Sequence, residues 1–175
     1  MLHCPYCHGY EVAGGRLGVL ATGEGSLHQA MLLPDWSGDV TLFTNGAFEP
    51  SAAQREALAA RGVRIEPRRI AGLVGEGEAL SGVRLAGPDG AELLPLDALF
   101  TTPRTRMASP LAEQLGCAFD EGPQGPVIRT DERKETTVNG VYAAGDAARP
   151  RHNATWASAD GVTAGIAAHQ SLALA

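Results

Sequence analysis

The sequence is poor in several features that would indicate other classes of protein. It has three cysteines in 175 residues, too few for the disulfide framework of a secreted mini-domain. No apolar run approaches membrane-spanning length, and the first residues lack the basic and apolar regions of a signal peptide. The net charge is −6 and no long basic stretch occurs, which argues against nucleic acid. We therefore expect a cytoplasmic protein without membrane or nucleic-acid partners.

The most informative pattern is a pair of cysteines two residues apart in the segment HCPYCH, residues 3–8. The pattern matches c-type haem attachment, but that reaction takes place outside the cytosol. Zinc needs a second pair of ligands, whereas Cys117 stands alone in an apolar segment and is expected to be buried. A reducing cytosol disfavours a structural disulfide. The pattern therefore favours a redox dithiol of Cys4 and Cys7, without metal, in which His8 is the neighbouring acid/base group.

A nucleotide-binding unit follows the dithiol. Residues 16–22 predict a buried strand, and Gly23-Glu24-Gly25 predict a tight turn. Residues 26–33 predict a helix that ends at Pro34, and residues 39–45 a second, parallel strand. This order is the βαβ unit of a dinucleotide-binding fold, in which glycines let the backbone approach a pyrophosphate at the helix N-terminus. The candidate phosphate contacts are Gly23, Gly25 and Ser26.

Two positions in this unit depart from the dinucleotide-binding pattern. The third fingerprint position, usually Gly or Ala, is His28, which we expect to be an ordinary helix residue. The second strand ends in Thr44-Asn45-Gly46, with neither the acid that reads NAD nor the arginine that reads NADP. Thr44 and Asn45 are the candidate cofactor contacts at this end, but the missing discriminator argues against a nicotinamide cofactor.

The rest of the first hundred residues predicts a helix and a β-meander. Residues 51–62 predict an amphipathic helix with Ser51 as N-cap and Gly62 as its stop. Strand signals follow, with a hairpin turn in residues 73–80 and a Pro-Asp-Gly turn at 88–90. The second Gly-x-Gly, in residues 73–80, belongs to that hairpin and not to a phosphate site.

The character of the sequence changes after Pro103. Residues 109–116 predict a short helix, residues 125–131 a strand, and residues 141–148 an apolar strand that ends in Gly-Asp. From Thr155 a helix rich in small residues follows, in which Gly161 and Gly165 allow close packing. The expected fold class is α/β. The expected segments are 1–14 (dithiol), 15–102 (a Rossmann-like nucleotide-binding domain with a meander) and 103–175.

The order of these signals resembles a known family. A CxxC directly before a nucleotide-binding βαβ unit, then TxxNGVYAAGD at 136–146 and a small-residue helix, resembles the low-molecular-weight thioredoxin reductases over nearly the whole chain. The segment CPYCHGYE is more similar still to the flavin-dependent dithiol oxidases of that superfamily, such as the gliotoxin and holomycin oxidases. Thioredoxin reductases usually carry an aspartate where this chain has His8.

The resemblance implies roles for individual residues. Cys7 would lie nearer the flavin, Cys4 would exchange with the substrate, and His8 would take the acid/base place. The C-terminal segment would be the second half of an FAD-binding domain, and its helix dipole would favour the negative charge of reduced flavin. The implied FAD contacts are Gly145, Asp146, Ala147, Thr155 and Trp156.

The resemblance also implies partners. Family members begin with an FAD half-domain that does not precede the dithiol here, so we expect a second copy or another chain to cover the exposed face. The substrate would be a small dithiol or disulfide, or a thioredoxin-like protein. The missing nicotinamide discriminator favours oxygen as the far electron partner and leaves NADPH and NADH as alternatives. The opposing interpretation is an inactive nucleotide-binding fragment that needs a partner to hold FAD.

Overall fold

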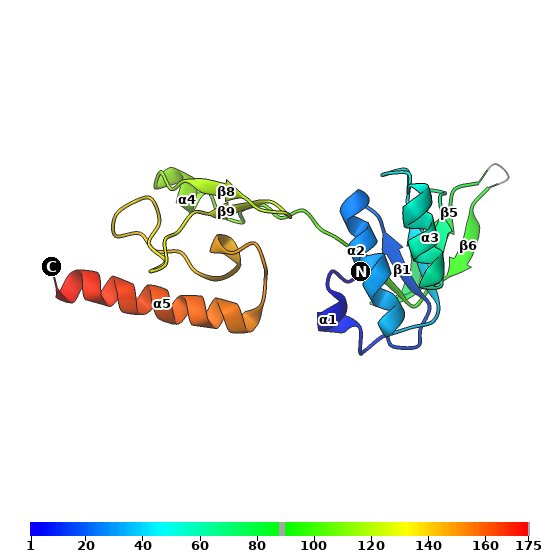
Figure 1. The fold of residues 1–175 in the computed structure, drawn as a ribbon, viewed down its shortest axis with the longest axis horizontal. Coiled ribbons are helices and arrows are strands. Elements are labelled where there is room, and N and C mark those ends of the chain that lie inside the picture. Colours follow the sequence, from blue (N-terminus) through cyan, green and yellow to red (C-terminus); the bar gives the residue numbers. More distant parts are fainter. Residues whose placement is uncertain (88–89, 175) are drawn as a thin grey trace. The chain divides into compact units, whose positions relative to one another are not determined.

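The computed structural model describes residues 1–87 and 90–174, which form two compact units, Met1–Pro103 and Arg104–Ala175 (Figure 1). The predicted Pro-Asp-Gly turn includes residues 88 and 89 and so lies outside the described residues. No helix in the described part of the chain is both long enough and apolar enough to cross a membrane.

A four-stranded parallel sheet forms the centre of the first unit. Its strands are β1 (Leu17–Leu20), β2 (Val40–Phe43), β3 (Val63–Glu66) and β7 (Ala98–Thr101), in the order β3-β2-β1-β7. The pairs β1–β2, β1–β7 and β2–β3 are all parallel. The predicted α/β class and the predicted βαβ unit are therefore confirmed.

Side-chain alternation gives the sheet two buried faces. On one face Leu17, Val19, Val40, Leu42 and Phe100 pack with residues from helices α2 (Leu27–Leu32) and α3 (Ala52–Ala60). On the other face Phe43 and Leu99 pack with residues of an antiparallel sheet. Gly18 lies on this second face, where a Cβ would come within 2.9 Å of Phe43, Leu96 and Leu99, so the close approach requires glycine.

The antiparallel sheet is the predicted meander. It consists of β4 (Ile70–Glu76), β5 (Ala79–Leu85) and β6 (Glu92–Pro95), in that order. The second Gly-x-Gly, at residues 75–77, lies in the β4–β5 hairpin as expected, with Gly77 at φ +57°.

The helices of the first unit agree with the sequence pattern, with one correction. Ser51 forms a capping box with Gln54 at the start of α3, and Gly62 follows that helix at φ +71°. His28 lies in α2 as expected. Pro34 does not stop the chain's helical path, because it lies in the 3₁₀ turn η2 (Leu33–Asp35) that follows α2 directly. Proline is tolerated there because the first turn of a helix needs no N–H donor.

The second unit has little regular sheet. It contains α4 (Leu111–Gln114), the hairpin β8 (Phe119–Glu121) with β9 (Pro126–Ile128), the 3₁₀ turn η3 (Gly145–Ala148) and the long helix α5 (Ala154–Ala173). The predicted strand over 141–148 is wrong. Tyr142 forms one isolated bridge to Glu135, and η3 takes the end of the segment. A strand needs a ladder partner, and the described residues offer this segment no more than that bridge.

Helix α5 begins close to the expected position. Asn153 caps it, since its Oδ1 accepts hydrogen bonds from the N–H groups of Thr155 (2.9 Å) and Trp156 (3.4 Å). The close packing expected at Gly161 and Gly165 is absent from the described residues, because a Cβ at either position would meet nothing within 4 Å.

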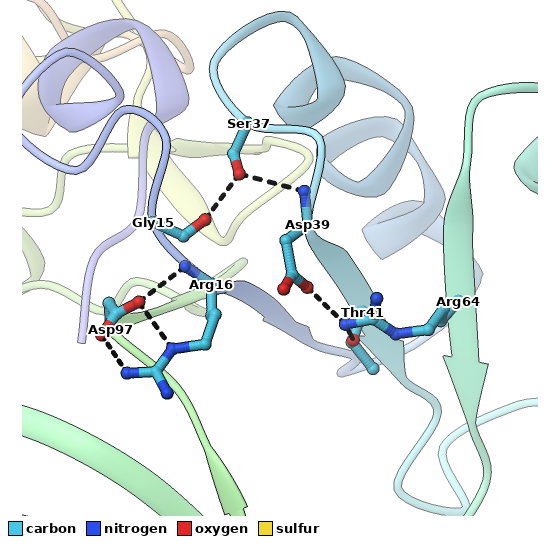
Figure 2. Close-up of polar contacts among 7 residues, drawn as sticks. All are labelled: Gly15, Arg16, Ser37, Asp39, Thr41, Arg64 and Asp97. Carbon is cyan, nitrogen blue, oxygen red and sulfur yellow. Dashed lines mark hydrogen bonds and ion pairs between the residues drawn. The ribbon is translucent and has the colours of Figure 1, made fainter.

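Polar contacts hold the amino ends of the central strands of the first unit (Figure 2). Ser37 Oγ donates to the Gly15 carbonyl (2.5 Å) and accepts from Asp39 N–H (3.1 Å). Arg16 donates to Asp97 from its backbone N–H (2.7 Å), Nε (2.9 Å) and Nη2 (2.5 Å). These bonds hold the pKa of Asp97 at about 2, below its usual 3.8. The contacts join the segments that lead into β1, β2 and β7.

We expect Asp97→Asn to lower the free energy of unfolding at neutral pH by about 0.5–1 kcal/mol, since both partners of this pair are more than two-fifths exposed and solvent screens them. A lowered pKa stabilises the fold above the unfolded value of 3.8, and this stability is lost as the pH falls towards about 2. Urea unfolding of both proteins across this range measures the difference. A gap between wild type and variant that stays constant with falling pH would contradict the assignment.

Candidate functional site

The two cysteines of the CxxC pair lie on a single helical turn. Cys4 is the N-cap of α1 (Pro5–His8), with Pro5 in the first turn. Cys4 is half-buried and Cys7 exposed, and both are free thiols. Their sulfur atoms lie 2.6 Å apart, near the 2.03–2.05 Å of a disulfide bond. The local fold thus brings the pair to where a disulfide can form.

The two thiols differ in their hydrogen-bonding roles. Cys7 Sγ donates a hydrogen bond to Cys4 Sγ, and this bond is the main cause that raises the pKa of Cys7. Burial and the charges of Cys4 and Glu11 raise that pKa further. Cys7 therefore keeps its proton, and Cys4 is the sulfur that accepts. The half-buried His8 packs edge-on to His3, with ring centroids 5.9 Å apart.

Backbone pairing attaches the dithiol segment to the parallel sheet. Leu2 forms a parallel bridge with Phe100: its N–H donates to Leu99 O, and Thr101 N–H donates to Leu2 O, both at 2.9 Å. Gln29 of α2 donates from Nε2 to His3 O at 2.6 Å. The Gln29 side chain is buried and its Oε1 has no partner among the described residues. These contacts fix the chain directly before Cys4.

An aromatic contact fixes the chain on the other side of the pair. The Tyr6 and Trp36 rings meet edge-to-face, with centroids 5.6 Å apart. Trp36 also lies against Gly9, where a Cβ would come within 2.7 Å of the indole and 2.6 Å of Pro5 O. Leu2, Gln29 and Trp36 were not predicted from the sequence. A possible signal was that Trp36 is one of only two tryptophans.

The loop after β1 combines open space with internal bonds. A Cβ at Gly23 or Gly25 would meet nothing within 4 Å, so no described contact requires glycine there. Ser26 is buried, and its Oγ accepts from Thr22 N–H at 3.1 Å. Glu24 accepts from Gln54 Nε2 at 2.5 Å. The loop leaves room for a phosphate at its glycines, but Glu24 adds a negative charge beside that room.

The turn after β2 is held by its own contacts. Thr44 is buried. Asn45 has a positive φ of 52°, and its Oδ1 accepts from Ile70 N–H at 2.9 Å. The guanidinium of Arg69, the residue directly before β4, lies over Gly46. It brings a positive charge to the end of β2, where the strand's own sequence carries no arginine. The Thr44 carbonyl, which accepts from Ala47 N–H at 2.8 Å, and the Asn45 side chain thus support the turn itself.

The candidate cofactor residues of the second unit lie where η3 meets α5. Gly145 has φ +68°, and a Cβ on it would come within 3.2 Å of Ala157 Cβ. Asp146 and Ala147 are exposed, and Asp146 has no hydrogen bond or ion pair among the described residues. The N–H groups of Thr155 and Trp156 are already taken by Asn153. Asp146, Ala147 and Trp156 are therefore exposed where η3 packs against the start of α5, and Gly145 is buried at that junction.

Comparison with known proteins finds relatives along most of the chain. The family described as "Pyridine nucleotide-disulphide oxidoreductase" matches residues 41–161. "Thioredoxin reductase sirT" of Leptosphaeria maculans is 31% identical, with 94% of this chain and 53% of that protein aligned. "Thioredoxin reductase tcpT" of Claviceps purpurea is 34% identical, with 83% and 46% aligned.

A solved structure gives the same likeness. The crystal structure of the oxidoreductase from Agrobacterium tumefaciens has a TM-score of 0.85 and 46% identity, covering 97% of this chain and 55% of its own. The chain thus spans about half the length of the relatives it matches.

We expect Gly9→Ala to displace α1 from Trp36, because the added methyl group has no room, at a cost of about 1–3 kcal/mol. Gly38→Ala is the matched control, since a Cβ there meets nothing within 4 Å. Urea unfolding followed by Trp36 fluorescence, in a Trp156→Phe background, measures both. Equal stability of the two variants would show that Gly9 does not anchor the dithiol.

Proposed function

Because the chain belongs to the pyridine nucleotide-disulphide oxidoreductase family and is thioredoxin reductase-like, we propose that it carries the dithiol of a flavin-linked disulfide oxidoreductase. The redox pair is Cys4 and Cys7. The observation that carries this proposal is the 2.6 Å separation of two free sulfurs on a turn that the sheet, Gln29 and Trp36 hold in place.

The exchange step follows from the two thiols. In the reducing direction Cys4 thiolate attacks one sulfur of a substrate disulfide, and the other substrate sulfur leaves as a thiolate. Cys7 then loses its proton and attacks Cys4, which releases the second substrate thiolate and forms the Cys4–Cys7 disulfide. Two electrons have passed from the pair to the substrate. In the oxidising direction the same steps run in reverse and a substrate dithiol reduces the pair.

His8 is proposed as the acid/base group of this exchange. It follows Cys7 directly and is half-buried beside His3. An imidazole exchanges protons near neutral pH, so it suits the proton that Cys7 must lose before it attacks.

The second unit is proposed to hold part of FAD. The exposed Asp146 carboxylate has no partner among the described residues and can accept hydrogen bonds from the hydroxyls of a polyol chain. Gly145 and Ala147 flank it in η3, and Gly145 packs against Ala157 in the first turn of α5, which also holds Thr155 and Trp156. The N-terminus of the 20-residue α5 favours negative charge. These residues fit the group. Bound FAD would supply the two-electron centre that resets the dithiol.

The electron partner at the far end is proposed to be oxygen, with NADPH and NADH as the alternatives. Glu24 places a carboxylate in the loop where a dinucleotide pyrophosphate would lie, and Asn45 is bonded to Ile70. Both observations favour a partner that needs no nucleotide site in the first unit. Arg69, which lies over Gly46, is the observation on the side of NADPH.

The proposed substrate is a small dithiol or disulfide, or a thioredoxin-like protein, handled in the cytoplasm. Cys4, the sulfur proposed to meet the substrate, is partly exposed, which supports access by either. A second copy or another chain is proposed to cover the second unit, which has an apolar hollow of about 310 Å³. Leu111, Leu115, Val141 and Tyr142 are among its lining residues. The same hollow favours the alternative that the chain alone is an inactive fragment.

We expect Cys4→Ser and Cys7→Ser each to abolish thiol–disulfide turnover, because either change removes one sulfur of the pair. Cys117→Ala is the control: Cys117 is buried in the second unit, so we expect activity to persist. Reduction of an aromatic disulfide reagent and titration of rapidly reacting thiols measure the effect. Turnover that survives either serine variant refutes the redox pair.

We expect the chain to retain FAD after incubation and desalting only where a second chain completes the site. Visible absorption, recorded across a size-exclusion run with light scattering, should place flavin in the dimeric fraction. Asp146→Ala should reduce the retained flavin, while Asp120→Ala, which removes an exposed pair with Arg129, leaves it unchanged. A flavin-free, monodisperse monomer with an ordinary melting transition would support the inactive-fragment alternative.

A further inference from the structure

A buried carboxylate in the second unit takes no part in the proposed thiol chemistry. Asp160 of α5 is 4% exposed. Arg149 donates to it from Nε (2.8 Å) and Nη2 (2.7 Å), and Lys134 Nζ lies 3.0 Å from Oδ1. These cations hold the pKa of Asp160 far below its usual range, so the group stays ionised. A buried charge is tolerated because two cations and a bidentate bond compensate for its lost hydration.

The same arginine touches an aromatic ring. The Arg149 guanidinium lies 5.5 Å from the centroid of the Trp156 ring. This is the geometry of a cation–π contact. Trp156 and Asp160 are four residues apart on α5 and so lie on one helix face, where a single guanidinium can reach both. Trp156 remains 42% exposed, so the arginine covers only part of the ring.

Arg149 also ends the turn that bears the candidate cofactor residues. It is the C-cap of η3, which begins at Gly145 and contains Asp146. Gly145 packs against Ala157, the neighbour of Trp156. Lys134 reaches the same region from the other side: it has φ +68°, and its carbonyl accepts from Ala143 N–H at 3.0 Å. Asp160 thus joins three segments: the turn at Lys134, η3 and α5.

We propose that Asp160 is a positioning residue that, through Arg149, holds Trp156 as a stacking platform for a planar aromatic ligand beside the Asp146 carboxylate. The ligand class is a flat aromatic ring with a hydroxylated chain, because the ring stacks on Trp156 and the hydroxyls donate to Asp146. The inference rests on the proposed flavin function and deepens it. Neither Arg149 nor Asp160 needs to touch the ligand.

The first test needs no ligand. Trp36→Phe leaves Trp156 as the single tryptophan, whose accessibility acrylamide quenching reports. In this background we expect Arg149→Met and Asp160→Asn to raise the quenching constant at least about twofold, since the cation leaves the ring. Arg149→Met keeps the Lys134–Asp160 bridge, so the contact of Arg149 with Asp160 and Trp156 (the clamp) can be tested without leaving Asp160 unpaired. Asp120→Asn, which removes an exposed pair with Arg129 in the same unit, is the control.

The second test uses riboflavin, which carries the ring and the hydroxylated chain without an adenosine. We expect its dissociation constant, measured by flavin fluorescence on the 175-residue chain, to rise at least about tenfold in both variants and to stay unchanged in Asp120→Asn. Arg149→Lys should recover only part of the affinity, because lysine lacks the planar bidentate fork.

Three results would overturn the proposal: unchanged quenching in both clamp variants, riboflavin affinity equal to wild type in folded variants, or no riboflavin binding by the wild-type chain. Turnover of the Cys4→Ser and Cys7→Ser variants tests the thiol function independently of riboflavin binding, which tests the platform. A wild-type chain that binds no riboflavin but has an active dithiol defeats the platform alone. An inactive dithiol with clamp-dependent riboflavin binding defeats the thiol function alone.

Discussion

The bridge between Leu2 and Phe100 is the constraint on which the dithiol geometry depends. One helical turn is too short to be stable by itself, because nucleation costs more than a single turn returns. The four residues of α1 therefore take their conformation from what lies around them. The bridge fixes the chain before Cys4, and Trp36 fixes it after Cys7. Because the parallel sheet and Trp36 restrain the chain on both sides, the two sulfurs keep their short separation without a disulfide.

The second unit is ordered in a different way. The first unit has two apolar clusters on opposite faces of one sheet. The second has one short hairpin, an apolar hollow, two isolated bridges and exposed apolar side chains on α5, such as Val162 and Ile166, among its described residues. Its internal order depends more on ionic contacts, above all on Asp160. Charge pairs fix direction but bury little apolar surface, so this unit gains more than the first from a covering partner.

Local signals in the sequence were sufficient for most of the fold. The βαβ unit, the capping box at Ser51 and the β4–β5 hairpin each depend on residues close together in the chain, and each was predicted. The strand over 141–148 was not, because its apolar pattern is local but a strand also needs a neighbour. The CxxC was recognisable from spacing alone. Gln29, Trp36 and Arg149 were not, since each acts through contacts that only the folded chain brings together.

The two units divide the proposed chemistry into separable parts. Thiol exchange needs only the two sulfurs and a proton acceptor, and these lie within the first unit. A single exchange therefore requires nothing from the second unit. Repeated turnover is different, because the disulfide must be reset by a two-electron centre, and the residues proposed to hold that centre lie in the second unit. Whether the chain is an enzyme or a fragment is thus decided by η3 and α5, and the integrity of the CxxC pair is compatible with both.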